Sequence, residues 1–166
     1  MTRRKISDVI KEYNINNISI GTLGSHSALN IFKGAKEEGF KTVCICKKDD
    51  IIVYKKFSLV DELIIVKDFT EILDDEVQKK LKKLNTILIP HGSFTAYLSL
   101  EQLIDRLYIP MFGNSELLTW EASREKQKDW LLRAGLRLPR TFESPARIEG
   151  LVLAKLPGAR GGKGYL

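Results

Sequence analysis

The sequence predicts an α/β fold built on a parallel, doubly wound sheet. Short apolar segments typical of buried strands alternate along the chain with longer amphipathic segments typical of helices. Such alternation favours a parallel sheet with helices on both faces. The chain has 166 residues, of which 43% are hydrophobic and 29% are charged, and this composition is sufficient for a globular core.

The first three elements are expected between residues 17 and 46. NISIGTL (17–23) predicts a strand. SALNIFKGAKEEGF (27–40) predicts a helix, because its apolar residues recur on one side and Gly39 follows the last turn. KTVCIC (41–46) predicts a second strand. We expect its two cysteines to be buried as small hydrophobic side chains, because two ligands do not make a zinc site.

The rest of the sheet is expected between residues 47 and 114. A polar stretch (47–58) precedes DELIIV (61–66), which predicts a short buried strand. EILDDEVQKKLKKL (71–84) predicts a helix whose acidic start and basic end suit its dipole. Three further elements complete this part: the strand TILIPH (86–91), the helix EQLIDRL (101–107) and the strand IPMFGN (109–114).

The character of the sequence changes near residue 115, and we expect two domains, 1–115 and 116–166. SELLTWEASREKQKDWLLRAG (115–135) predicts one long helix with Ser115 as its N-cap and Gly135 as its stop. It is followed by the strand candidates RTFES (140–144) and LVLAK (151–155) and by the glycine-rich turn PGARGGKG (157–164). A strand and a phosphate loop without the rest of their sheet are not a domain, so 116–166 is expected to be the opening of an incomplete one.

The charge distribution narrows the class of ligand. The net charge of +6 comes from residues 124–166, where it coincides with the glycine-rich turn. No basic stripe with interleaved aromatic residues accompanies it, so a small phosphorylated ligand is favoured over a nucleic acid. No apolar run approaches the roughly 20 residues of a membrane span, and no apolar signal core follows the N-terminus. We therefore expect a cytoplasmic protein without a membrane partner.

Two polar turns are candidate ligand-binding segments. GTLGSHSAL (21–29) follows the first strand, and IPHGSFTAY (89–97) follows a later one. Ligands bind at the carboxyl ends of parallel strands, where a helix N-terminus also suits an anion. A simple helix cap is the alternative for each turn alone, but two such turns at equivalent places favour a shared polar ligand.

The candidate side chains in these turns indicate binding and not catalysis. Gly21 and Gly24 are expected to let the backbone turn tightly and approach a ligand. Neither turn contains a nucleophile, base and acid together, so no catalytic residue and no metal ligand is assigned. The residues assigned to the ligand site are Gly24, Ser25, His26, Ser27 and Ser93.

Four motifs together carry a resemblance to a known family: GTLGSHSAL, ILIPHGSF, FGN before a tryptophan-containing helix, and KLPGARGGKGY. They resemble the formate-dependent synthetases of 5-formaminoimidazole-4-carboxamide ribonucleotide, archaeal purine-biosynthesis enzymes of the ATP-grasp superfamily. The resemblance implies a Rossmann-like, pre-ATP-grasp domain over 1–115, followed by the start of an ATP-grasp domain. It also implies an ATP-dependent ligase that transfers formate to 5-amino-imidazole-4-carboxamide ribonucleotide in IMP biosynthesis.

The resemblance also implies individual roles. His26 and Ser93 match residues that contact the ribonucleotide, and Lys155 matches the strand lysine that reaches ATP. The loop over the ATP phosphates corresponds to Gly158, Ala159, Arg160, Gly161, Gly162, Lys163 and Gly164. The ligands for Mg²⁺ (or Mn²⁺) are expected downstream of Leu166, so the chain alone is expected to be inactive.

Two alternatives stay open at this stage. One is another ATP-grasp carboxylate–amine ligase with a different acceptor, and the other is a non-catalytic, nucleotide-binding remnant. The sequence also leaves open the formyl donor and the oligomeric state, including a homo-oligomer.

Overall fold

The computed structural model describes residues 6–114, 116–142, 144–160 and 163–165, with only the backbone described for residue 6 and from residue 155 on. The chain divides into two compact units, Met1–Ser115 and Glu116–Leu166.

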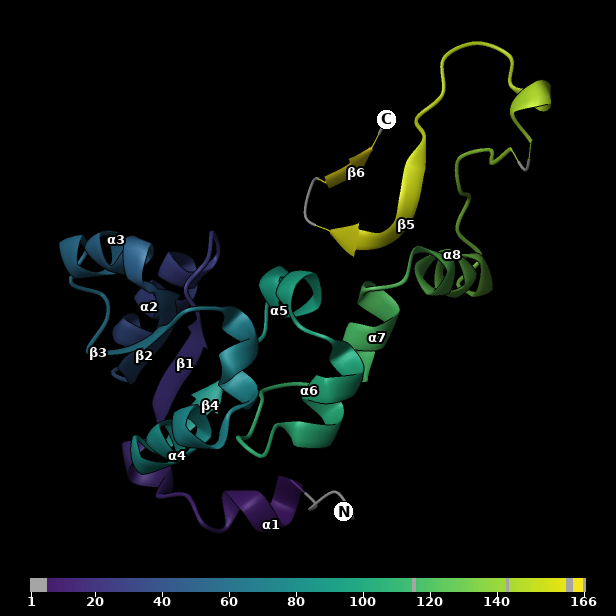
Figure 1. Cartoon of the computed structure of the whole chain (residues 1–166). Coiled ribbons are helices and arrows are strands. Elements are labelled where there is room, and N and C mark those ends of the chain that lie inside the picture. Colours follow the sequence, from purple (N-terminus) through teal and green to yellow (C-terminus); the bar gives the residue numbers. More distant parts are fainter. Residues whose placement is uncertain (1–5, 115, 143, 161–162, 166) are drawn as a thin grey trace. The chain divides into compact units, whose positions relative to one another are not determined.

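A four-stranded parallel sheet forms the centre of the first unit, in the order β3-β2-β1-β4 (Figure 1). Ser19 in the middle of this sheet pairs with Lys41 on one side and with Thr86 on the other. The predicted α/β class with a parallel sheet is therefore confirmed. The strands are β1 (Ser19–Leu23), β2 (Lys41–Lys47), β3 (Glu62–Val66) and β4 (Thr86–Leu88).

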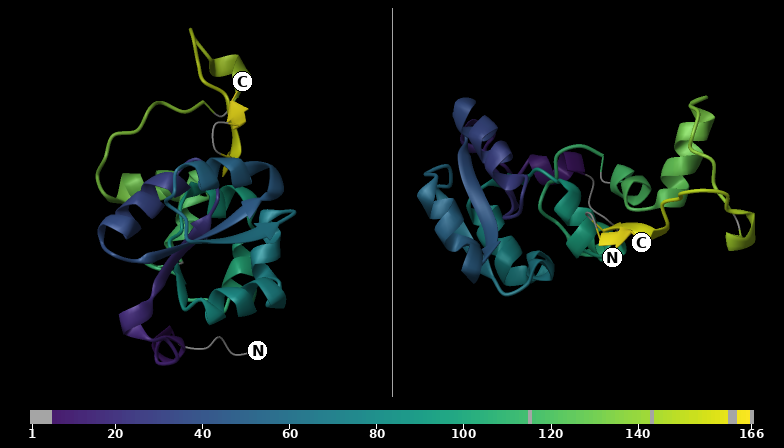
Figure 2. Two further views of the ribbon diagram at one scale, coloured as in Figure 1. Left: turned by 90° about the vertical axis from the view of Figure 1, so that its left-hand side faces the viewer. Right: turned by 90° about the horizontal axis from the view of Figure 1, so that it is seen from above.

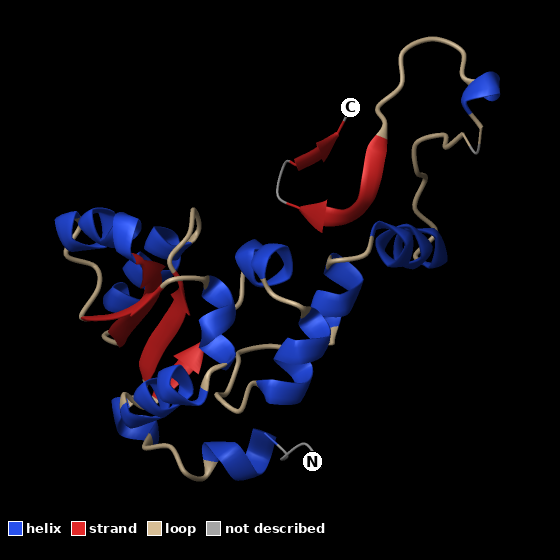
Figure 3. Cartoon of the chain, in the orientation of Figure 1, coloured by secondary structure: helices blue, strands red, loops and turns tan. Residues whose placement is uncertain are grey.

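Helices lie on either side of this sheet (Figures 2 and 3). Gly39 has a φ of +82° just after α2, and it ends that helix as predicted. The α-helices are α1 (Ile6–Ile10), α2 (Ala28–Glu37), α3 (Ile51–Lys56), α4 (Asp75–Lys83), α5 (Gly92–Tyr97) and α6 (Leu100–Arg106). Short 3-10 helices are η1 (Ile15–Asn17), η2 (Lys48–Asp50) and η3 (Phe69–Leu73).

Two predictions for the first unit are corrected, and one stretch contains elements for which the sequence made no prediction. The polar stretch 47–58 contains η2 and α3, because Tyr54 is buried there and its ring lies edge-on to Phe32 at 6.2 Å. Residues 71–84 are not one helix, because the extended backbone of Asp74 separates η3 from α4.

The second corrected prediction concerns residues 109–114, which form no strand. Met111 makes only an isolated parallel bridge with Leu88. The Leu88 N–H donates to the carbonyl of Pro110, and the Phe112 N–H donates to the carbonyl of Leu88, both at 2.8 Å. Pro110 has no N–H to extend the ladder, and Gly113 turns the chain at a φ of +86°.

The core has two layers, one on each face of the sheet. One layer joins α2 and α3 to β2 through Ala28, Phe32, Tyr54 and the two cysteines. Both cysteines are buried and unbonded, as predicted. The neighbouring Cys46 thiol and burial raise the pKa of the Cys44 thiol, which keeps it protonated. Side chains in β2 alternate between faces, so Val43 and Ile45 belong to the other layer, where η3 contacts β2.

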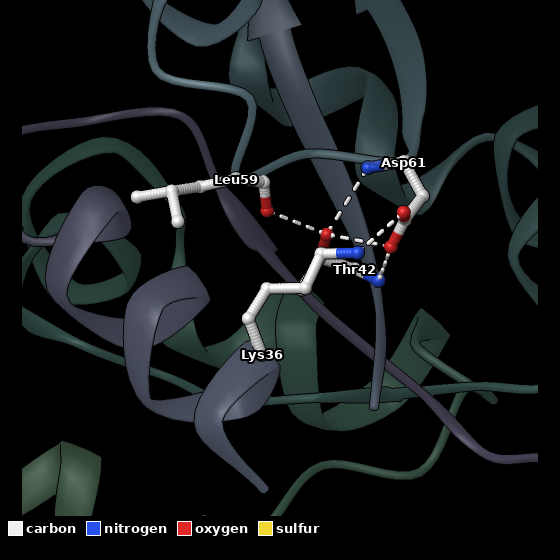
Figure 4. Close-up of polar contacts among 4 residues, drawn as sticks. All are labelled: Lys36, Thr42, Leu59 and Asp61. Atoms are coloured by element: carbon white, nitrogen blue, oxygen red, sulfur yellow. Dashed lines mark hydrogen bonds and ion pairs between the residues drawn. The ribbon is translucent and has the colours of Figure 1, made fainter. Parts of the chain in front are cut away.

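Figure 4 shows a polar network of Lys36, Thr42, Leu59 and Asp61 at the start of β2. Because the strands are parallel and the two polar turns follow the ends of β1 and β4, the network lies at the opposite end of the sheet from them. The Thr42 hydroxyl donates to the carbonyl of Leu59 at 2.7 Å and accepts the Asp61 N–H at 3.1 Å. The Thr42 N–H donates to the Asp61 carboxylate at 2.7 Å, and the Lys36 ammonium pairs with the same carboxylate. The network therefore fixes the segment that leads into β3.

The second unit contains α7 (Leu117–Glu121), α8 (Arg124–Arg133), η4 (Pro145–Arg147), β5 (Lys155–Arg160) and β6 (Lys163–Tyr165). The single long helix predicted over 115–135 is wrong. Ser123 is extended there and caps α8, because its hydroxyl accepts the Lys126 N–H at 3.3 Å. The predicted N-cap Ser115 lies outside the described residues, and Gly135 ends α8 as expected, with a φ of +75°.

The strands of the second unit also differ from the prediction. Residues 140–142 and 151–154 are loop, and residue 143 lies outside the described residues. β5 begins at Lys155 and pairs antiparallel with β6, so that Lys155 faces Tyr165 and Arg160 faces Lys163. The segment 157–160 is therefore strand and not turn, although the register of its pairing with β6 shifts between Lys155 and Arg160.

Candidate functional site

The two polar turns meet at one edge of the sheet. β1 lies directly beside β4, and the Ser93 hydroxyl after β4 donates to the Ser25 hydroxyl after β1 at 2.8 Å. The Ser25 hydroxyl also lies 3.1 Å from Nδ1 of His26. The chain runs from β1 outward to β3 and then returns to place β4 on the other side of β1. Such a switch point is where open α/β sheets bind ligands.

His91 holds the second turn in place. Its Nε2 lies 3.1 Å from the Leu23 carbonyl, and its Nδ1 accepts the Ser93 N–H at 3.3 Å. A carbonyl only accepts and an N–H only donates, so His91 is neutral with its proton on Nε2. Burial lowers the pKa of His91, and the nearby His26 acts in the same direction, whereas the hydrogen bond to Leu23 opposes them. His91 thus connects the end of β1 to the start of α5.

A cleft of about 390 Å³ opens at the carboxyl ends of β1, β2 and β3. Three of the predicted residues, Gly24, Ser25 and His26, line it. Ser93 does not line it, because it is only 1% exposed and reaches the cleft through the Ser25 hydroxyl. The lining side chains and glycine are Gly24, Ser25, His26, Leu29, Lys47, Asp50, Val53, Tyr54, Phe69 and Tyr97.

Ser27 and two glycines complete the first turn. Ser27 occupies the N-cap position of α2, but its side chain makes no capping hydrogen bond, and it does not line the cleft. Gly21 and Gly24 do not adopt a left-handed φ. They are glycines because a Cβ at Gly24 would lie 2.7 Å from Cβ of Cys46, and one at Gly21 would lie 2.5 Å from Cγ2 of Thr86. Packing between strands, and not a tight turn, therefore requires them.

An aromatic corner at one side of the cleft was not predicted. The ammonium of Lys47 lies 5.0 Å from the ring centre of Phe69 and 5.9 Å from that of Tyr97. The two ring centres are 5.2 Å apart. Lys47 also pairs with the Asp68 carboxylate at 3.6 Å. The only local signal was the position of Lys47 at the carboxyl end of a strand, since Phe69 and Tyr97 come from other elements.

The residues assigned to ATP lie in the β5–β6 hairpin. Lys155 is the first residue of β5, as expected of a strand lysine. Gly158, Ala159 and Arg160 continue that strand, and Lys163 and Gly164 lie in β6, whereas Gly161 and Gly162 lie outside the described residues. Their contact with ATP stays a prediction.

Within the described ranges, no group of three His, Cys, Asp or Glu side chains is placed to hold a metal ion. These residues therefore do not fit a magnesium site, and no step of the chemistry is assigned to a metal here. None of the helices in the described part of the chain combines the length and the apolarity that a bilayer crossing requires.

Comparison with known proteins places the chain in a family. A family model described as "Protein of unknown function (DUF1246)" matches residues 20–142, which is most of the chain. The chain belongs to the DUF1246 family. A curated relative from Archaeoglobus fulgidus, named 5-formaminoimidazole-4-carboxamide-1-(beta)-D-ribofuranosyl 5'-monophosphate synthetase, is 53% identical over 163 residues. The match covers 98% of this chain and 45% of that relative, so this chain spans less than half of the relative's length.

Solved structures share the fold of this chain. The IMP biosynthesis protein PurP from Thermococcus kodakaraensis is 36% identical, with a TM-score of 0.64 over 76% of this chain and 40% of that one. A pyruvate carboxylase from Rhizobium etli is 20% identical, with a TM-score of 0.65 over 90% of this chain and 15% of that one, and this likeness shows the fold alone. The resemblance predicted from the four motifs is therefore confirmed, as is the predicted fold class.

Proposed function

We propose that this DUF1246 chain supplies the ribonucleotide-binding part of an ATP- and formate-dependent ligase. The ligase formylates the amine of 5-amino-imidazole-4-carboxamide ribonucleotide to the 5-formamido product in purine biosynthesis. The observation that carries the proposal is the contact between Ser93 and Ser25 at the switch point, beside a cleft that His26 also lines. The names of the similar synthetase and of PurP support the same substrate class.

The cleft suits a ribonucleotide in size and in chemistry. Its volume of about 390 Å³ is in the range of small-molecule sites, roughly 300 to 1,000 Å³. It offers hydroxyl, imidazole, ammonium and carboxylate groups, together with aromatic rings. Hydroxyl and imidazole groups can hydrogen-bond the ribose and the carboxamide of such a ligand. The described residues thus bind and orient the ribonucleotide.

The phosphoryl-transfer part of the reaction is assigned by similarity to the β5–β6 hairpin. ATP would supply the phosphoryl group that activates formate for attack by the amine. Lys155, Arg160 and Lys163 are the cations that would face its phosphates, because phosphoryl transfer needs positive charge around the transferred group. The chain spans less than half of its curated relative, so formylation is proposed for the longer protein.

Calorimetry with residues 1–166 and 5-amino-imidazole-4-carboxamide ribonucleotide tests the binding half of the proposal. We expect saturable binding that His26→Ala weakens by about 1 to 3 kcal/mol, because one hydrogen bond to a polar ligand group is lost. A matched variant is Ser27→Ala, whose side chain does not line the cleft and which should bind like the wild type. The absence of ribonucleotide binding to the wild-type chain would contradict the proposal.

A turnover assay tests the catalytic half. Residues 1–166 should show no formate-dependent ATP hydrolysis at any magnesium concentration, whereas the longer homologous enzyme should show it. Lys155→Ala in the longer enzyme should then remove most of the activity. Turnover by the purified chain, free of contaminating ligase, would show that the ATP and formate sites are wrongly assigned.

A further inference from the structure

Lys47 provides the positive charge of the cleft. Among the described residues that line the cleft, it is the only lysine or arginine, and Asp50 is the only carboxylate. Lys47 is the last residue of β2, so it lies at the carboxyl edge of the sheet, where the two polar turns meet. A phosphate that entered the cleft would be attracted by Lys47 and repelled by Asp50. The charge distribution therefore defines one phosphate-accepting side.

The ammonium group of Lys47 is held at this side by two aromatic rings. Phe69 is buried, and its ring centre lies 5.0 Å from Nζ of Lys47. Tyr97 is half exposed, and its ring centre lies 5.9 Å from the same atom. A cation within about 6 Å of a ring is attracted to its face, so the rings restrict an otherwise flexible side chain. Restriction before binding lowers the entropic cost of holding an anion.

The ion pair with Asp68 does not account for Lys47. The two charged atoms are 3.6 Å apart, and the side chains are 38% and 58% exposed, so this pair contributes little. The Asp68 carboxylate already accepts the Thr70 N–H at 3.0 Å and the Thr70 hydroxyl at 2.9 Å, where it caps η3. Both of these donors bind Oδ1 of Asp68, whereas Lys47 pairs with Oδ2, so only this weak, solvent-exposed ion pair competes with a ligand phosphate for the ammonium.

We infer that Lys47 binds the phosphate of the ribonucleotide, and that Phe69 and Tyr97 position its ammonium group for this contact. The inference rests on the proposed function, which places a ribonucleotide in the cleft. Lysine binds phosphate as a point charge, and hydrogen bonds to charged groups are about twice as strong as neutral ones. The phosphate therefore lies at the Lys47 side, which leaves the heterocycle and ribose to the side lined by Ser25 and His26.

The test compares two ligands that differ only in phosphate: 5-amino-imidazole-4-carboxamide ribonucleotide and its ribonucleoside. In Lys47→Met the ribonucleotide should bind at least about tenfold more weakly, and the ribonucleoside should bind within about twofold of the wild type. The matched control is Lys41→Met, which removes the same charge at the opposite end of β2. Lys41→Met should leave both affinities unchanged.

Two further variants separate binding from folding. Lys47→Arg keeps a charge that can stack on the rings, so it should keep the preference for the phosphorylated ligand. Asp68→Asn keeps a capping oxygen but removes a competing charge, so the ribonucleotide should bind as tightly as to the wild type, or more tightly. If Asp68→Asn bound the ribonucleotide more weakly than the wild type, the role of Lys47 would be overturned, even if Lys47→Met failed to fold.

Different results contradict the proposed function and the role of Lys47. A wild-type chain that binds no ribonucleotide contradicts the proposed function, and the role of Lys47 falls with it. If the wild-type chain prefers the ribonucleotide to the ribonucleoside and a folded Lys47→Met keeps the same preference, only the role of Lys47 is contradicted. The proposed function then still holds.

Discussion

The hydroxyl of Ser93 donates a 2.8 Å hydrogen bond to the hydroxyl of Ser25, which lies 68 positions earlier in the chain. Ser93 is buried, whereas Ser25 lines the cleft. Because the Ser25 oxygen accepts from Ser93, its own proton is directed elsewhere, either to Nδ1 of His26 at 3.1 Å or to a ligand. The buried Ser93 therefore orients the half-buried Ser25, and the two turns act as a unit.

The first prediction is that Ser25 and Ser93 are energetically coupled in ligand binding. Ser93→Ala should weaken binding of 5-amino-imidazole-4-carboxamide ribonucleotide by about 1 to 3 kcal/mol, because the Ser25 hydroxyl loses the donor that orients it. Ser25→Ala with Ser93→Ala should cost less than the sum of the two single changes, as measured by calorimetry. Thr95→Ala is the control, because that hydroxyl donates only to Gly92 in its own turn. Strictly additive losses would show that the serines act independently.

The second prediction concerns His91 and pH. Burial lowers the pKa of His91 below its ordinary value of about 6.5, so the unfolded chain binds this proton more readily than the folded chain. The stability of the fold should therefore fall as the pH drops below about 6.5, and this contribution should level off below the folded pKa.

His91→Asn tests this prediction by chemical denaturation between pH 7.5 and pH 5, values chosen around the ordinary histidine pKa of about 6.5. Asparagine keeps an acceptor for the Ser93 N–H but loses the bond to Leu23, so the variant should be about 1 kcal/mol less stable at pH 7.5. It should also lose the part of the pH dependence that belongs to His91. If the free energy of unfolding of His91→Asn changed with pH as much as that of the wild type, groups other than His91 would cause the pH dependence.

Much of the first unit could be predicted because buried parallel strands have unbroken apolar sequences. KTVCIC differs from β2 by a single residue, Lys47. Glycines were equally reliable as helix stops, since Gly39 and Gly135 both adopt the left-handed φ expected after a last turn. These features depend on local chemistry, and local chemistry is visible in one sequence.

Elements that depend on distant contacts were missed. α3 has lysines on its exposed side, and its other side is buried because the ring of Tyr54 packs against Phe32 of α2. The break between α7 and α8 did leave a signal, because Ser123 is a favourable cap in the middle of the predicted helix. The apolar residues on both sides of Ser123 nevertheless favoured one continuous helix.

The candidate site also contains some residues that the local sequence reveals and others that only distant contacts bring together. Ser25, His26 and Ser93 could be chosen because each follows an apolar strand in a polar turn. The side chains of the aromatic corner share no local pattern, because Lys47 ends β2, Phe69 begins η3 and Tyr97 ends α5. Only the folded chain places them at one cleft.

The third prediction compares two glycines. Gly24→Ala should destabilise the first unit by about 1 to 3 kcal/mol, because its Cβ would lie 2.7 Å from Cβ of Cys46 and 2.9 Å from a ring carbon of Tyr54. Gly34→Ala is the matched control inside α2, where an added Cβ meets open space, and it should stabilise by roughly 0.5 to 1 kcal/mol. Denaturation in urea measures both. Equal effects of the two changes would rule out packing as the reason for Gly24.

The fourth prediction concerns the network at the start of β2. Burial alone would raise the pKa of the Asp61 carboxyl, but the Lys36 ammonium and the Thr42 N–H outweigh it and hold the pKa below its usual range. The stabilisation should therefore be present above the unfolded value of about 3.9 and be lost as the pH falls through the folded value.

Asp61→Asn removes the charge but keeps an oxygen for the Thr42 N–H. We expect a loss of about 1 kcal/mol at pH 7, since Lys36 and Asp61 are 32% and 35% exposed and solvent screens their attraction. At a pH below the folded pKa the wild type is also uncharged at this position, so the two proteins should there be equally stable. Asp49→Asn, at an exposed carboxylate, is the control and should change little at either pH. A deficit of the same size at neutral and acidic pH would mean that the hydrogen-bond geometry of Asp61, and not its charge, stabilises this end of the sheet.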